Sequence, residues 1–229
     1  MTAWLRAVGL VLGLSNLSIA QAATFLDLGW DYKRGDFGTG ITQTLQAGSV
    51  GLSRTAGGWA VSARVPWWRL ENSGGSVSGL GDALTSVSHL GWRGGWSFGA
   101  GATIKWPTGD GDRGLGTGTT DWAVQGALGR DLGQATRLLA QAGYTVTGGD
   151  YRDFGSWGLG LFHHRGRLGL SLAYARRGAS LDGLPAGEDL GLTLYRDLGG
   201  RWLGRMGAVK GLSEGSPDLA LGLGLSRRL

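Results

Sequence analysis

The residues whose types and spacing come nearest to a known chemistry lie in the glycine-rich stretch Trp106–Asp121, WPTGDGDRGLGTGTTD. A phosphate-binding loop of the strand–loop–helix type requires the pattern G-x-x-x-x-G-K-[ST]. Gly109 and Gly114 have this spacing, but Leu115 stands where the lysine would contact phosphate. No helical periodicity follows the stretch to supply a helix N-terminus. The stretch is therefore not a phosphate-binding loop of this kind.

The same stretch resembles a calcium loop only in part. Asp110, Asp112 and Asp121 occupy positions 1, 3 and 12 of the twelve-residue template,. Position 6, which requires glycine, is Leu115, and Asp121 is shorter than the usual glutamate,. We predict no metal site. Two interpretations remain: a mobile outer loop whose glycines permit positive φ, and a loop folded inward as a gate with internal pairs among Asp110, Asp112 and Arg113.

Catalytic residues are sparse. The sequence has three histidines and no cysteine, which excludes disulfides and thiolate metal sites. On a strand, Ser86 and Ser88 point to the face opposite His89, so this histidine has no nearby nucleophile. The other two, His163 and His164, lie beside a short turn, where an interfacial role is expected. We predict no catalytic residues and no cofactor, and therefore no enzyme.

The first 22 residues have the organisation of a secretory signal. Arg6 ends a short basic segment, residues 7–19 are apolar but too short to span a membrane, and Ala20-Gln21-Ala22 fits the cleavage pattern,. The formal charge is +5, and 19 of the 22 basic residues are Arg, which suits phosphate or carboxylate partners. Export makes lipopolysaccharide phosphate, rather than nucleic acid, the expected partner.

Residues 23–229 alternate apolar and small or polar residues with a period of two, which is typical of strands. In the segment 96–106 one face reads Trp, Phe, Ala, Ala, Ile, Trp and the other Ser, Gly, Gly, Thr, Lys. Tryptophans bracket two apolar faces, Trp59 with Trp67 and Trp96 with Trp106, as the two interfacial girdles of a membrane barrel require. We expect the apolar face to contact lipid and the polar face to line the interior.

The connections between the expected strands alternate between short and long. Tight turns are expected at 56–57, 94, 133–134, 165–166 and 199–200, and longer loops at 71–79, 107–117, 148–153 and 178–186. Short periplasmic turns and long outer loops are typical of up-and-down outer-membrane barrels. The expected strands are 25–34, 40–54, 58–70, 80–93, 95–106, 118–131, 135–147, 154–164, 167–177, 187–198, 201–212 and 217–229. We predict an all-β, transmembrane, antiparallel β-barrel of about 12 strands in the bacterial outer membrane, preceded by a cleaved signal peptide; ten or fourteen strands stay open.

The polar face predicts which residues line the interior. The candidates are Arg64, Lys105, Gln125, Arg177, Arg201, Arg205, Arg228, Asp121, Asp131, Asp189 and Asp218. Balanced pairs would form a structural charge ladder, because unpaired buried charges are costly. An excess of arginine would leave a cationic constriction that selects anions. Both outcomes fit the sequence.

Three motifs together resemble a known family. Ser78-Gly79-Leu80-Gly81-Asp82 opens a strand, Lys105–Asp110 (KWPTGD) closes another, and Gly114–Gly118 (GLGTG) follows. Their order resembles the outer-membrane family labelled putative MetA-pathway phenol-degradation proteins, over roughly residues 76–150. The resemblance implies a transporter-like barrel that passes small aromatic or hydrophobic molecules. The function expected is a passive channel for small-molecule solutes, and the rival is a non-conducting structural or lipid-binding barrel.

Overall fold

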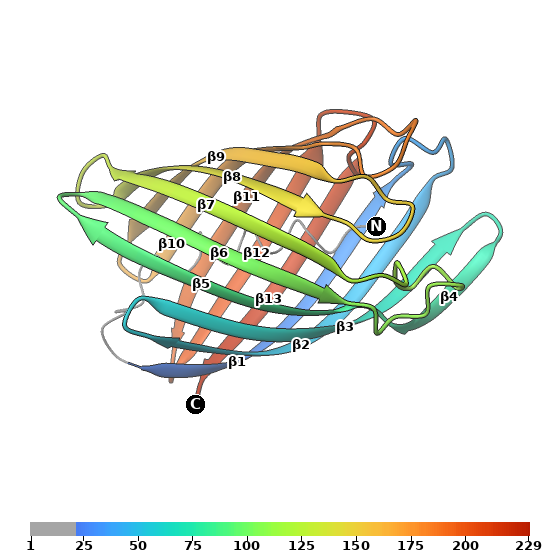
Figure 1. Cartoon of the computed structure of the whole chain (residues 1–229). Helices are drawn as coiled ribbons and strands as arrows, with labels where there is room; N and C mark the ends of the chain where they lie inside the picture. The colour runs from blue at the N-terminus through green and yellow to red at the C-terminus, as the bar shows by residue number, and fades with distance from the viewer. Residues whose placement is uncertain (1–21) are drawn as a thin grey trace.

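Residues 22–229 of the computed structural model form one closed antiparallel sheet of thirteen strands (Figure 1). The predicted signal peptide, residues 1–22, lies outside this range apart from Ala22. No helix in the described range is long and apolar enough to cross a membrane. The strands are β1 (Ala23–Gly35), β2 (Gln43–Ala56), β3 (Trp59–Asn72), β4 (Gly75–Leu80), β5 (Ala83–Arg93), β6 (Trp96–Trp106), β7 (Asp121–Asp131), β8 (Thr136–Val146), β9 (Phe154–Arg165), β10 (Leu168–Arg177), β11 (Gly187–Gly199), β12 (Trp202–Gly211) and β13 (Leu219–Arg228).

The sheet closes because its first strand pairs with its last. Leu28 of β1 lies opposite Leu225 of β13, and the other strands pair with their neighbours in the chain, except that β4 and β5 both pair with β3. The strands β4 and β5 share one position beside β3, so thirteen strands fill twelve positions around the barrel. This confirms the prediction of about twelve strands. Closure leaves no edge with unpaired N–H and C=O groups, which lipid could not satisfy.

The two faces of the wall follow the sequence alternation. On β6, the side chain of Phe98 is 52% exposed on the outside, whereas Thr103 is 4% exposed on the inside. The strand β2, whose alternation is weak, places Leu45 and Ala47 inside rather than on the lipid face. Small residues line much of the inner face, which leaves room for long polar side chains.

Tryptophans mark both ends of the lipid-facing surface. Trp59 and Trp67 on β3, and Trp96 and Trp106 on β6, are all exposed on the outside. They are eight and ten residues apart, which corresponds to about 20–26 Å across a membrane for strands tilted by about 40°. This spacing matches the apolar band of roughly 25 Å in such barrels. The predicted girdles are confirmed.

One end of the barrel has tight turns and the other has long loops (Figure 1). At the short-turn end, Gly57-Gly58 joins β2 to β3 and Gly94-Gly95 joins β5 to β6, with φ of 55°, 86°, 58° and 76°. Both residues of such a turn need positive φ, which glycine adopts without strain. The strands β1 and β13 begin and end at this same end, which is the periplasmic end in outer-membrane barrels.

The expected loop 71–79 is wrong. Instead, β3 continues to Asn72 and β4 starts at Gly75, so the chain forms a hairpin that projects past the barrel rim (Figure 1). Beyond it the register changes from Trp67 opposite Leu80 to Arg64 opposite Leu84. The Gly- and Ser-rich sequence around the turn predicts a loop, but only the tip of the hairpin between Asn72 and Gly75 is irregular.

The register change is a β-bulge that leaves Asp82 as an extra residue. Opposite the bulge lies Pro66, which has no N–H to donate, although its carbonyl accepts a hydrogen bond from Gly81 N at 2.9 Å,. A bulge shifts the alternation of side chains between the two faces. Asp82 consequently points inward and is only 5% exposed.

Candidate functional site in the barrel interior

The lumen at the short-turn end contains a cavity of about 570 Å³. This volume is within the range that accommodates a small organic molecule. The charged residues that line it comprise four arginines and two aspartates, namely Arg167, Arg201, Arg205, Arg228, Asp27 and Asp197. The cavity wall therefore has an excess of positive charge.

Asp27 is fixed in this cavity by two side-chain hydrogen bonds. Its carboxylate accepts hydrogen bonds from Ser53 Oγ at 2.8 Å and from Ser226 Oγ at 2.6 Å. Arg64 lies two strands away in the same row and interacts electrostatically with both Asp27 and Arg205. One carboxylate thus faces two arginines, and the local charge is positive.

Arg205 lies flat across the wall because its neighbour has no side chain. An added Cβ on Gly224 would come within 2.5 Å of Arg205 Nε. The glycine opposite Arg205 therefore makes space for the guanidinium group along the inner wall. Its position on β12 is set by register, opposite Gly224 of β13 and Tyr195 of β11.

Aromatic rings flank the arginines in the same cavity. The ring of Phe162 packs edge-on against Tyr195, with centroids 6.1 Å apart, and beside His164 at 6.2 Å. Phe25 also lines the cavity and is 8% exposed. Arginines and aromatic rings facing one space can contact an anionic group and a flat apolar group together.

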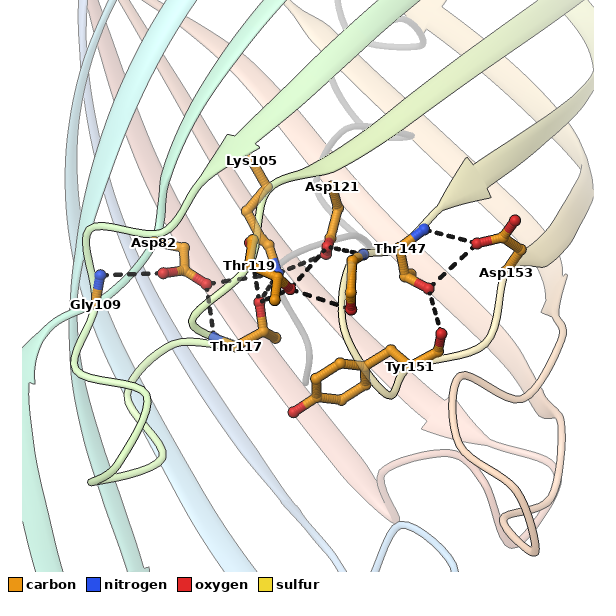
Figure 2. Close-up of polar contacts among 10 residues, drawn as sticks. Asp82, Lys105, Gly109, Thr117, Thr119, Asp121, Thr147, Tyr151 and Asp153 are labelled. Atoms are coloured by element: carbon orange, nitrogen blue, oxygen red, sulfur yellow. Dashed lines mark hydrogen bonds and ion pairs between the residues drawn. The ribbon is translucent and has the colours of Figure 1, made fainter.

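A second charged group, the Lys105 cluster, lies inside the wall at the long-loop end and consists of Lys105, Asp82, Asp121 and Thr117 (Figure 2). Lys105 Nζ is 2.5 Å from Asp121 Oδ2 and 3.6 Å from Asp82 Oδ2, and it donates to Thr117 Oγ1. The three charged side chains are 3%, 4% and 6% exposed for Lys105, Asp121 and Asp82. Removal of one charge would leave the others buried without full compensation.

The Lys105 cluster holds the loop that the sequence presented as a candidate gate (Figure 2). Asp82 accepts one hydrogen bond from Gly109 N and one from Thr117 N, each at 3.0 Å. Asp121 accepts one from Gly148 N at 3.1 Å, which connects the next outer loop. The loop 107–120 is therefore fixed at its base to the bulge and to the loop 147–153.

The three sequence motifs meet at this cluster. An added Cβ on Gly116 would lie 2.4 Å from Asp82 Oδ1, and one on Gly79 would lie 2.8 Å from Leu115 Cδ1. Leu115 itself is 4% exposed and packs on the hairpin. The glycines of the motifs therefore permit the close approach of loop, bulge and hairpin.

A third group of contacts ties the remaining outer loops together. Arg177 Nη2 donates to Gly215 O at 2.6 Å, and Ser216 Oγ donates to Glu188 O at 2.8 Å. Asp189, opposite Ala175 in the sheet, is 3% exposed nearby. The loop 212–218 therefore packs against the inner wall and narrows the lumen at the long-loop end.

Most of the predicted lining residues occupy the inner face. These are Arg64, Lys105, Gln125, Arg177, Arg205, Asp121, Asp131, Asp189 and, at the short-turn end, Arg228. Arg201 instead lies exposed in the turn before β12, with φ of 72°, at the rim of the cavity. Asp218 is exposed in the loop before β13. These two residues are outside the strand wall because the strands end one residue short of them.

The predicted gate residues lie on the exposed part of the loop. Asp110, Asp112 and Arg113 are all exposed, and within residues 22–229 none of them forms an ion pair. Their one internal contact is a hydrogen bond from Arg113 N to Asp110 Oδ1 at 3.1 Å. The calcium-loop interpretation is wrong, because Asp121 is buried against Lys105 while the other two aspartates point away. The described range holds no group of three His, Cys, Asp or Glu placed to bind a metal.

Sequence reasoning missed two residues of the interior. Asp27 alternates with Leu26 and Leu28, which are on the lipid side, and this alternation was a usable signal. Asp82 is in step with the inward-facing residues Leu84, Ser86 and Ser88 of β5, so the alternation of that strand was a second usable signal.

Comparison with known proteins supports the fold. No family model and no curated protein matches the chain. Among solved structures, a NanC porin matches at 12% identity and TM-score 0.64, over 89% of this chain and 100% of that one. A KdgM porin matches at 8% identity and 0.59 over 88% and 98%, and the CymD monoaromatic hydrocarbon channel at 8% and 0.53 over 97% and 93%. With its apolar outer belt, the chain is a transmembrane β-barrel of the bacterial outer-membrane type.

Proposed function

We propose that this barrel is an outer-membrane channel through which small solutes pass passively, without catalysis. The observation that supports this most directly is the cavity of about 570 Å³ in the lumen at the short-turn end. A barrel with a purely structural role would be expected to fill its interior with side chains, as small barrels do. The named solved structures that share the fold are porins and a channel.

The preferred solute class follows from the cavity wall. Four arginines against two aspartates favour an anion,, and Phe25, Phe162 and Tyr195 offer flat apolar contacts. The resemblance to the phenol-degradation family, and the monoaromatic hydrocarbon channel among the similar folds, support aromatic solutes. Small aromatic carboxylates satisfy both features of the wall.

The outer loops restrict what enters. The Lys105 cluster fixes the loop 107–120, and the contacts of Arg177 fix the loop 212–218. Lipid partners depend on orientation: with the long loops outside, lipopolysaccharide would surround the tryptophans Trp67, Trp106 and Trp122.

Single-channel recording in planar bilayers tests the function. We expect discrete conductance steps and a reversal potential that reports anion preference, together with swelling of liposomes in sodium benzoate. A folded, heat-modifiable protein that gives no conductance and no swelling would favour the rival, a non-conducting structural or lipid-binding barrel.

Arg205 supplies the test of selectivity. Arg205→Glu changes the charge by two units beside the permeating ion, which alters its interaction energy by about 1.7 kcal/mol at ~5 Å in a water-like dielectric. The same change disfavours an anion and favours a cation, so the anion-to-cation permeability ratio should fall by more than about tenfold. The matched control is Arg54→Glu, because Arg54 lies on the outer face. An equal ratio in wild type and Arg205→Glu would show that the cavity does not set selectivity.

A further inference from the structure

The outer face of the barrel carries a regular set of arginines at the short-turn end. Each strand that ends at the short-turn end has one exposed, outward-facing arginine among its last four residues. We call this set the arginine belt; its members are Arg54 (β2), Arg93 (β5), Arg130 (β7), Arg165 (β9), Arg196 (β11) and Arg227 (β13). Six strands of six share the feature, so it encircles the barrel.

The outward orientation of the belt follows from register. Arg93 and Arg130 both lie opposite Trp96, which is exposed on the outside. Arg165 and Arg196 both lie opposite Leu168, which is also exposed. Residues opposite each other in a sheet share a face, so these arginines point toward lipid rather than toward the lumen.

The belt lies at the level of the tryptophan girdle. The guanidinium of Arg130 stacks over Trp96 at 4.9 Å from the ring centroid, and that of Arg227 over Trp202 at 5.4 Å. Tryptophan rings mark the headgroup region of a membrane. The charged ends of the belt are therefore at the height of lipid phosphates.

Acidic residues are missing from this part of the surface. Among residues 22–229, the acidic side chains on the outward face of a strand are Glu71 and Glu188, both at the long-loop end. There they pair with Arg69 at 3.6 Å and Arg176 at 3.5 Å. The six belt arginines form no ion pair within the described part of the chain. The two ends of the outer surface thus differ in charge.

From this geometry we propose that the arginine belt binds the phosphate groups of anionic phospholipids in the periplasmic leaflet. Guanidinium groups match phosphate in shape and hydrogen-bonding pattern. Alternate strands are about 10 Å apart, which is close to the spacing of neighbouring lipid headgroups. Six positive charges with no acidic side chain on the same outward face at this end favour a lipid with a net negative charge over a zwitterionic one. Lipopolysaccharide would occupy the opposite leaflet, beside the long loops.

The test uses the purified full-length barrel in vesicles that contain dibrominated phosphatidylglycerol or dibrominated phosphatidylcholine. Quenching of tryptophan fluorescence reports which lipid occupies the surface. For wild type we expect at least about a fivefold preference for phosphatidylglycerol, the effect of one arginine near a charged surface, and a decline with added salt.

The variant replaces Arg93, Arg165 and Arg196 with Gln, which leaves both arginine–tryptophan pairs in place. Its preference should fall to within about twofold of unity, while its channel conductance stays unchanged. The matched control replaces Arg69, Arg176 and Lys210 with Gln at the long-loop end and should retain the preference. A second variant carries lysine at the same three belt positions. It keeps the charge and should keep most of the preference, which separates loss of charge from misfolding as the cause of a lost preference.

Three outcomes would overturn the proposal. They are the absence of any phosphatidylglycerol preference in wild type, an equal loss in the control variant, and a belt variant that loses binding to lipopolysaccharide micelles instead of phosphatidylglycerol. Each can occur whether or not the barrel conducts.

Discussion

Lys105 is the residue whose replacement should most change the outer mouth of the barrel. In Lys105→Met the side chain keeps its length but loses its charge, and two carboxylates that are 4% and 6% exposed lose their cation. Disruption of a buried ion pair costs about 3–5 kcal/mol. We take the lower end, about 3 kcal/mol, because backbone N–H groups of Gly109, Thr117 and Gly148 still contact Asp82 and Asp121,.

The stabilisation that Lys105→Met removes from this cluster should appear as a larger open population of the loop 107–120. About 3 kcal/mol corresponds to about a hundredfold increase in the open population. Arg113 is the one lysine or arginine in this loop and is exposed at its tip, so trypsin can cleave there once the loop opens. When opening is fast relative to cleavage, the cleavage rate follows the open population.

The assay is limited trypsin digestion of the folded barrel in detergent, followed by the appearance of a fragment that starts at Gly114. Cleavage after Arg113 should be about a hundredfold faster in Lys105→Met than in wild type. Lys210→Met, at an exposed position on the outer face, is the control and should leave the rate unchanged. Adding Asp121→Asn to Lys105→Met removes one uncompensated charge and should slow cleavage again. A rate within about threefold of wild type for Lys105→Met would refute the assignment of the cluster as the anchor.

Two further changes test the fold. Gly81→Ala places a Cβ within 1.8 Å of Trp68 Nε1 and should lower the free energy of unfolding by about 1–3 kcal/mol; Gly48→Ala has nothing within 4 Å and should be neutral, as measured by urea-dependent unfolding in micelles. Asp182→Asn breaks the pair with Arg152, whose side chains are 62% and 86% exposed for Arg152 and Asp182, and should change the same free energy by less than about 1 kcal/mol. A loss in Asp182→Asn as large as that in Gly81→Ala would contradict the view that outer-loop ion pairs contribute little.

The strands and turns of the barrel wall could be predicted from sequence, because alternation and turn residues depend on neighbouring positions in the chain. The alternation along 96–106 defined which face meets lipid, and the glycine pairs at 57–58 and 94–95 defined the turns. The outward orientation of the belt arginines could also be predicted from sequence, since each occupies an outward position of a recognisable strand. Their regularity becomes evident only when the strands are aligned around the barrel.

The loop 107–120 shows where local rules fail. Its aspartates Asp110 and Asp112 suggested a metal or a gate, yet they lie exposed, and the contacts that hold the loop come from Asp82, Lys105 and Asp121. Asp82 is in step with the inward residues of β5, but it contacts Gly109 N, Thr117 N and Lys105 Nζ from other segments of the chain. No pattern near residue 82 records those contacts.

The sequence by itself therefore determined the barrel, its two faces and its approximate strand number, because a period of two and turn residues act over a few positions. The tertiary structure decided which inward charges meet, that the loop 107–120 is anchored, and that a cavity remains at the short-turn end. Those outcomes depend on register between strands far apart in the chain, and register is fixed only when β1 pairs with β13 and the barrel closes.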